Sequence, residues 1–187
     1  MPPLISQTAC NVGLTCCFRL NISDRPPQVD DQDFDVALPS LLPSEMASEE
    51  VQAVHYHRFM ATTARVHMRF RLAVRRNTAL WVDAVKSADA ELADVIATLP
   101  RHLEPELPDP GELQELRHSQ PWIVWQRFSV TLVLLHLRMR IHSSLNRHWA
   151  ADGEQYAWAK SVAIDSASRI IWISYHWDQP AEMRSQW

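Results

Sequence analysis

The 187-residue sequence predicts an all-α protein, an irregular helical domain with one long buried helix at its centre. Two observations favour helices. Only 3 glycines stand against 12 prolines, and hydrophobic residues make up 47% of the chain without the alternating β-branched runs that are typical of strands. The length suits one domain with a sizeable core, so we expect residues 1–187 to form a single domain.

Residues 21–47 are predicted to form an extended linker that is rich in proline and aspartate. Pro26 and Pro27 cannot continue a helix, because proline lacks the amide donor and disfavours the α conformation in the residue before it. Aspartates then alternate with other side chains until the linker reaches a Leu-Pro pair. These residues are Asp31, Asp33, Asp35, Leu38 and Pro39.

Two amphipathic helices are expected after this linker. Ser48 is a suitable N-cap, and a helical pattern with separate apolar and arginine stripes continues to about Arg76. The arginine stripe consists of Arg58, Arg65, Arg69 and Arg76. Since charged stripes on helices are usually solvated or paired, we expect the same of this one. The second pattern begins near Trp81 and ends at Leu99-Pro100.

Residues 104–119 contain three prolines and a glycine and are predicted to be a Pro-rich surface loop.

The longest helix is expected to follow this loop. It has Pro121 in its first turn, where the missing amide costs nothing, and it continues to about Trp149. Apolar residues cover most of its circumference, which predicts a central, buried helix.

The last helix is expected over residues 153–177. Its alanines four apart, Ala159, Ala163 and Ala167, let another helix approach closely, and the long central helix is the expected partner. Its large apolar residues are spread too widely for one partner; they are Ile170, Ile171, Trp172, Ile173 and Trp177. We therefore expect bare apolar surface, self-association, and a domain that is incomplete at both ends.

Two sequence motifs in this chain resemble motifs of one family of regulatory proteins. Arg25-Pro26, followed by a hydrophobic position and the series Asp31, Asp33, Asp35, Val36, Leu38 and Pro39, is similar to the signature of the middle homology region of fungal binuclear-zinc-cluster transcription factors. Leu99-Pro100 resembles the segment that ends a helix in the same region. The resemblance covers roughly residues 14–177. It implies a nuclear regulatory domain that controls transcription and responds to a small-molecule effector or a co-regulator.

The resemblance also implies that DNA is bound by a zinc-cluster domain, which this chain does not contain. Cys10, Cys16 and Cys17 lack the spacing of a six-cysteine cluster, and the net charge of −4 differs from the basic balance of nucleic-acid-binding domains. We therefore expect no cofactor in this chain, with zinc implied only for the absent cluster. No apolar run approaches the ~20 residues of a membrane span, so no membrane partner is expected.

Two alternatives to a transcriptional regulator stay open. One is an all-α metal-dependent enzyme that uses Asp31, Asp33 and Asp35, although Val36 and Leu42 stand where a calcium loop needs glycine and glutamate. The other is a stand-alone helical interaction module. We favour a protein that is not an enzyme, because no phosphate-binding loop or nucleophile motif is present.

Aromatic and imidazole side chains offer the remaining candidate sites. Trp122, Trp125 and Phe128 form one stripe at the start of the long helix. Core packing is the ordinary interpretation of such a stripe, and a cleft for a small molecule or a partner is the alternative. The histidines do not share a helix face as metal ligands would, so we expect packing or surface roles for them. They include His55, His57, His67, His136, His142 and His148.

Overall fold

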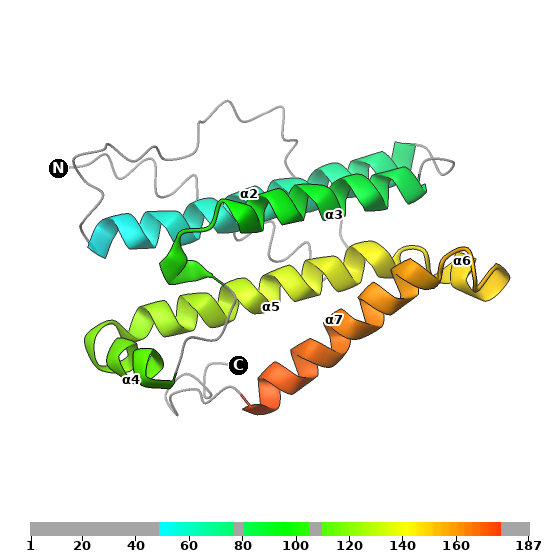
Figure 1. Ribbon diagram of the computed structural model, residues 1–187. Coiled ribbons are helices and arrows are strands. Elements are labelled where there is room, and N and C mark those ends of the chain that lie inside the picture. Colours follow the sequence, from blue (N-terminus) through cyan, green and yellow to red (C-terminus); the bar gives the residue numbers. More distant parts are fainter. Residues whose placement is uncertain (1–48, 77–80, 105–109, 177–187) are drawn as a thin grey trace.

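All regular structure within the described residues 49–76, 81–104 and 110–176 is helical in a computed structural model of the protein. The elements are α2 (Glu49–Arg76), α3 (Trp81–Ala97), the 3-10 turn η4 (Arg101–Leu103), α4 (Pro110–Ser119), α5 (Pro121–Ser143), α6 (Asn146–Ala151) and α7 (Ala157–His176) (Figure 1). The all-α prediction is therefore confirmed. The linker predicted over 21–47 lies outside the described residues, together with Arg25, Pro26, Asp31, Asp33, Asp35, Leu38 and Pro39.

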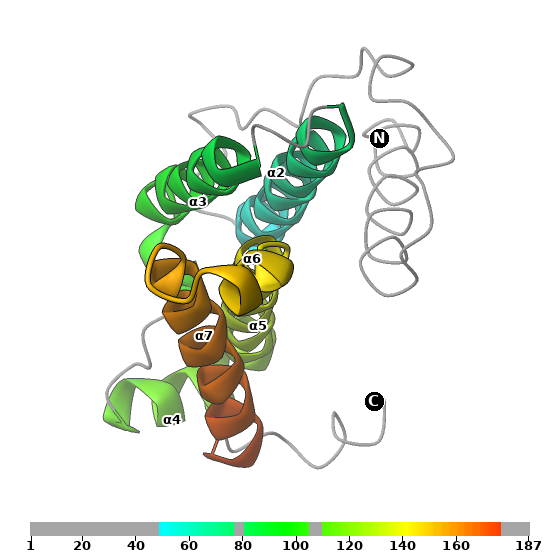
Figure 2. The ribbon, with the colours of Figure 1, turned by 90° about the vertical axis from the view of Figure 1, so that its right-hand side faces the viewer.

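The helices are arranged around α5. Helices α2 and α3 lie side by side and both contact α5, while α7 crosses α5 on another side (Figures 1 and 2). α4 and η4 pack near the start of α5, and α6 leads from its end into α7. None of the helices in the described part of the chain is long and apolar enough to cross a membrane.

Helix α5 is buried on most of its circumference, as its apolar pattern predicts. Its buried residues are Ile123, Val124, Gln126, Arg127, Phe128, Val130, Thr131, Leu134, Leu135, Leu137, Ile141 and His142. Polar groups on this helix have partners on its neighbours: Arg127 Nε donates to the Glu104 carbonyl at 3.2 Å, and the Tyr56 and Ser129 hydroxyls are 2.9 Å apart. The prediction of a central, buried helix is confirmed.

The expected single helix from Pro121 to about Trp149 is wrong at its end, because α5 stops at Ser143 and α6 begins at Asn146. The Ser143 hydroxyl donates to the Arg140 carbonyl at 3.1 Å, and the Ser144 hydroxyl donates to the Ile141 carbonyl at 2.7 Å. These side-chain bonds compete with the backbone ladder at the place where the helix breaks. α5 is thus about 35 Å long at 1.5 Å per residue.

The predicted Pro-rich loop over 104–119 is corrected by α4, which occupies Pro110–Ser119. Pro110 stands at the first helical position, where its missing amide is tolerated. The residues after Gly111 are mostly good helix formers, and their helix propensity outweighs the turn signals that precede them.

The last helix begins at Ala157, later than the predicted residue 153. Asp152 Oδ1 accepts a hydrogen bond from the Gln155 amide in the turn before α7.

Two of the three alanines in the predicted ridge of α7 pack as expected. Ala159 and Ala163 are buried and α7 lies closely on α5, whereas Ala167 is half-buried. Phe128, Leu135 and Ile173 form a small core cluster between these two helices. The larger cluster joins α2, α3 and α5, with Phe59, Val85 and Ile141 among its members, and it also includes Ala159 of α7. Part of α7 stays exposed, including Ile171 and Trp172, as the wide spread of its apolar residues predicts.

Candidate functional site

A pocket of about 310 Å³ lies between α2 and the end of α3. Its lining residues come from the first half of α2 and from the segment that closes α3. They are His55, Arg58, Phe59, Thr62, Val95, Thr98, Leu99 and Pro100. The volume is at the lower end of the range of roughly 300–1,000 Å³ that ligand pockets occupy.

The wall on the α3 side forms because the chain turns sharply there. The Leu99 amide bonds to the Ile96 carbonyl at 3.1 Å, and the Thr98 hydroxyl bonds to the Val95 carbonyl at 3.0 Å. Pro100 then adopts an extended conformation, φ −65° and ψ 147°, which ends the helical path before η4. Leu99 and Pro100 are thereby placed at the pocket.

On the α2 side, one helical face supplies the lining. His55, Arg58, Phe59 and Thr62 follow the spacing i, i+3, i+4 and i+7, so they share a face. Phe59 is buried in the main core and gives the pocket an apolar base, together with buried Val95. The Thr62 hydroxyl donates to the Arg58 carbonyl at 2.8 Å, which leaves its oxygen able to accept a bond.

His55 has an environment that favours the neutral imidazole. Burial lowers its pKa below 6.5, and the positive charge of Arg58 lowers it further. The ring lies 5.3 Å from that of His102 in η4, and the buried Nδ1 has no hydrogen-bond partner among the described residues. At neutral pH the positive charge at the pocket therefore belongs to the Arg58 guanidinium, while His55 offers a neutral donor or acceptor.

This combination of groups suits an organic anion better than a metal ion. A guanidinium, a neutral imidazole and two threonine hydroxyls surround an apolar base. Guanidinium groups bind carboxylates with two parallel bonds, and an apolar base favours a hydrocarbon body. Among the described residues, no three His, Cys, Asp or Glu side chains are grouped so that they could hold a metal.

The residues expected to line a cleft on α5 lie elsewhere. Trp125 packs on Tyr56, with ring centroids 5.8 Å apart, at the edge of the larger core cluster. Phe128 is buried in the smaller cluster against α7, and Trp122 is half-buried at the start of α5. The structure therefore places Trp125 and Phe128 in different clusters, and neither lines the pocket between α2 and α3.

The sequence marks Leu99 and Pro100 only as family-like residues at the end of a helix, and it does not predict the pocket that they line. His55 is predicted to be a packing or surface residue, and Arg58 belongs to the stripe that is predicted to be solvated or paired. Their shared face with Thr62 was the available signal, since polar residues at i, i+3 and i+7 interrupt an otherwise apolar side of the helix. Arg69 of the same stripe does pair, with Glu91 of α3 at 2.8 Å, so the expected pairing is confirmed for that residue.

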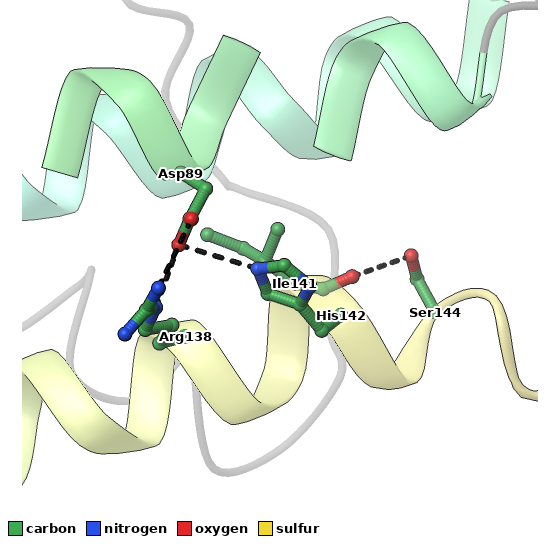
Figure 3. Close-up of polar contacts among 5 residues, drawn as sticks. All are labelled: Asp89, Arg138, Ile141, His142 and Ser144. Carbon is green, nitrogen blue, oxygen red and sulfur yellow. Dashed lines mark hydrogen bonds and ion pairs between the residues drawn. The ribbon is translucent and has the colours of Figure 1, made fainter. Parts of the chain in front are cut away.

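A second polar cluster joins α3 to α5 (Figure 3). Arg138 donates two hydrogen bonds to Asp89 from one edge of its guanidinium: Nε to Oδ1 at 2.8 Å and Nη2 to Oδ2 at 3.3 Å. His142 Nε2 lies 3.2 Å from the same Oδ1. The His142 side chain first, and Arg138 second, lower the pKa of Asp89 to about 2 against the opposing effect of burial.

The cluster continues from His142 to α7. The Trp158 ring meets the His142 ring edge to face, with centroids 5.5 Å apart, and Lys86 Nζ lies 5.7 Å from the centroid of Trp158. The His142 side chain is only 1% exposed. A catalytic imidazole needs access to substrate, so this arrangement fits a role in fixing α3 and α7 on α5.

The serines next to His142 agree with a structural role. In Figure 3 the Ser144 hydroxyl points to the Ile141 carbonyl. The Ser143 hydroxyl donates in the same way to the Arg140 carbonyl. Both hydroxyl protons are thus engaged by the backbone of their own helix. Neither Ser143 nor Ser144 therefore directs its hydroxyl proton at the His142 imidazole.

Comparison of the chain with protein-family models, with curated proteins and with solved structures found no match.

Proposed function

We propose that this chain is a ligand-sensing regulatory domain that controls DNA-templated transcription, as its resemblance to the middle homology region of fungal zinc-cluster factors implies. DNA binding would be supplied by a zinc-cluster domain outside this sequence, and the site of action would be the nucleus. One observation carries the proposal. The family-like residues Leu99 and Pro100 line the same pocket as Arg58 and His55.

The chemistry of the pocket supports a small organic anion as the effector. Arg58 is a permanent cation, and its planar guanidinium matches the two oxygens of a carboxylate. Phe59, Val95 and Leu99 add apolar surface next to it. We therefore propose a monocarboxylate with an aromatic or aliphatic body that fits within about 310 Å³.

A binding measurement on the purified chain tests this ligand class. A panel of aromatic and aliphatic monocarboxylates is titrated by calorimetry at pH 7, each beside the primary amide with the same body. We expect carboxylates to bind and their amides to bind at least about tenfold more weakly, since a charge-assisted bond is worth about 1.5–3 kcal/mol. Equal affinity for acid and amide would refute the role given to Arg58.

Two matched variants locate the site. Arg58→Gln removes the guanidinium at the pocket, while Arg75→Gln makes the same change at an exposed position of α2. We expect only the first to weaken carboxylate binding, by about tenfold or more. Circular dichroism confirms that both variants are folded. Unchanged affinity in Arg58→Gln would place the ligand elsewhere.

The regulatory part of the proposal has its own test. The chain is fused to an unrelated DNA-binding domain and expressed in yeast with a matching reporter gene. A carboxylate that binds in calorimetry should change reporter output in the wild-type fusion and leave the Arg58→Gln fusion unchanged. A reporter that never responds to a bound ligand would contradict transcriptional regulation while leaving the binding site intact.

A further inference from the structure

Helix α7 carries a second apolar face in addition to the one that packs on α5. Four large side chains on it are strongly exposed: Ile164 is 53% exposed, Ile171 59%, Trp172 50% and Tyr175 83%. The Trp172 ring stacks on His176, with centroids 4.6 Å apart, so its orientation is already defined. α7 lies at the edge of the described helices (Figures 1 and 2), and the exposed fractions of these four side chains show that its second apolar face is accessible.

These four residues lie on the side of α7 opposite to its contact with α5. The buried residues Ala159, Ala163, Ser166 and Ile173 mark the inner side. Successive helical residues are rotated by about 100°, which puts Ser168 at the centre of the outer side, and the four exposed residues fall within about 60° of it. The outer face is therefore one continuous stripe, referred to below as the outer stripe.

We infer that the outer stripe binds the outer stripe of a second copy of this chain, with the two α7 helices antiparallel about a two-fold axis. The choice of a second copy rests on complementary charge. Asp165 and Arg169 are both exposed and lie on one flank of the stripe. An antiparallel two-fold arrangement brings equal flanks together, so an axis level with Ala167 sets Asp165 of each copy opposite Arg169 of the other.

The same register pairs apolar side chains on the other flank. Ile164 lies three residues before the level of the axis and Ile171 lies four residues after it. In the antiparallel pair, Ile164 of one copy is therefore within about 1.5 Å, one residue rise, of the level of Ile171 of the other. One flank is thus held by reciprocal ion pairs and the other by reciprocal isoleucine contacts.

Residue size is also complementary in this register. Ser168 lies next to the axis, where the two helices come closest, and a small side chain permits that approach. Trp172 of one copy lies at the level of residue 162 of the other, and Ser161, one residue rise of about 1.5 Å away, leaves room there for the indole ring. A stripe with large residues at one end and small residues at the other fits a reversed copy of itself.

Charge reversal tests this interface. Sedimentation of the wild-type chain over a range of concentrations should show conversion from the 21.6 kDa monomer to a species of twice that mass. Asp165→Arg sets a new arginine of each copy opposite Arg169 of the other, and Arg169→Asp sets two aspartates opposite each other. We expect each single variant to weaken association by about tenfold or more. Glu154→Arg, an exposed change outside the outer stripe, should associate like the wild type.

Mixing the two single variants separates contacts between copies from contacts within one helix. An equimolar mixture of Asp165→Arg and Arg169→Asp pairs two arginines with two aspartates across the interface, so association should return. Pairing within a helix cannot be restored in this way, because each chain keeps its own like charges. A mixture that stays monomeric, or a wild-type chain that stays monomeric at high micromolar concentration, would overturn the inference.

This interface is independent of the proposed effector site. Arg58 lies on α2, whereas the outer stripe lies on α7, so Arg58→Gln should associate like the wild type. Ile171→Ser should weaken association and leave carboxylate binding unchanged. Failure of one proposal therefore leaves the other standing.

Discussion

At the scale of single residues, the surroundings of each polar side chain depend on how deeply the fold buries it. His136, His142 and His148 recur every six residues, yet each has a different environment. His142 is enclosed beside Asp89 and Trp158, whereas His148 lies between the rings of Trp81 and Tyr156 at centroid distances of 6.0 and 5.2 Å. The half-buried His136 has its pKa lowered by burial and then by Arg140.

Asp89 gives a prediction for acid stability. Its pKa is about 2 in the folded chain and 3.8 when unperturbed, so the folded state binds fewer protons between these values. Stability from this group is present above about pH 4 and is lost as the pH falls through 2. Allowing for solvent at the partly exposed carboxylate, we expect Asp89→Asn to lower the free energy of unfolding by about 1–2 kcal/mol at pH 7.

Urea unfolding at several pH values checks this expectation. The difference between wild type and Asp89→Asn should shrink toward zero as the pH approaches 2. Asp94→Asn, at an exposed position of the same helix, serves as the control and should have little effect. A difference for Asp89→Asn that does not change with pH would show that the ionised carboxylate is not its source.

At the scale of the elements, α5 carries most of the packing. It contacts α2, α3, η4, α4 and α7, and its apolar residues extend around most of the helix. That pattern was sufficient to predict a buried helix, because only surrounding elements can cover an apolar surface on all sides. The break between α5 and α6 was missed, since two adjacent serines are tolerated in many helices and end this one through bonds to Arg140 and Ile141.

A matched pair of isoleucine substitutions tests the role of α5. Ile141 on α5 is 0% exposed, whereas Ile96 near the end of α3 is 42% exposed. Removing the same atoms from a closed site leaves a cavity, so we expect Ile141→Ala to lower the free energy of unfolding by about 2–5 kcal/mol. Ile96→Ala should lower it by about 1 kcal/mol or less. Chemical denaturation measures both, and equal losses would contradict the central position of α5.

At the scale of the whole molecule, the two core clusters share α5 and α7. The larger cluster joins α2, α3 and α5 and includes Ala159 at the start of α7, and the smaller one joins α5 to the later part of α7. Because α5 belongs to both, neither cluster keeps its packing when this helix unfolds. The helices should therefore unfold together as one cooperative unit.

This cooperativity is the whole-molecule prediction. Tryptophan fluorescence and far-ultraviolet circular dichroism should give the same midpoint in urea. Ile173→Ala, which reduces the cluster between α5 and α7, should shift both midpoints to the same lower concentration. Two separate midpoints, with only one of them moved by Ile173→Ala, would show that α7 unfolds on its own.

The sequence by itself determined the helical class, the buried character of α5 and the alanine ridge of α7. Each of these follows from local composition or from periodicity, which reports the apolar side of a helix without reference to any other helix. The start of α5 at Pro121 was also predictable, because proline is tolerated in the first turn of a helix.

Only the tertiary structure decided which faces of the helices contact one another. The pocket requires Arg58 of α2 and Leu99 after α3, and the charged cluster requires Asp89 of α3 and Arg138 of α5. These pairs are 41 and 49 residues apart in the chain. Periodicity fixes how side chains are arranged around one helix axis, but the rotation and crossing of two helices depend on how all of their side chains pack at once.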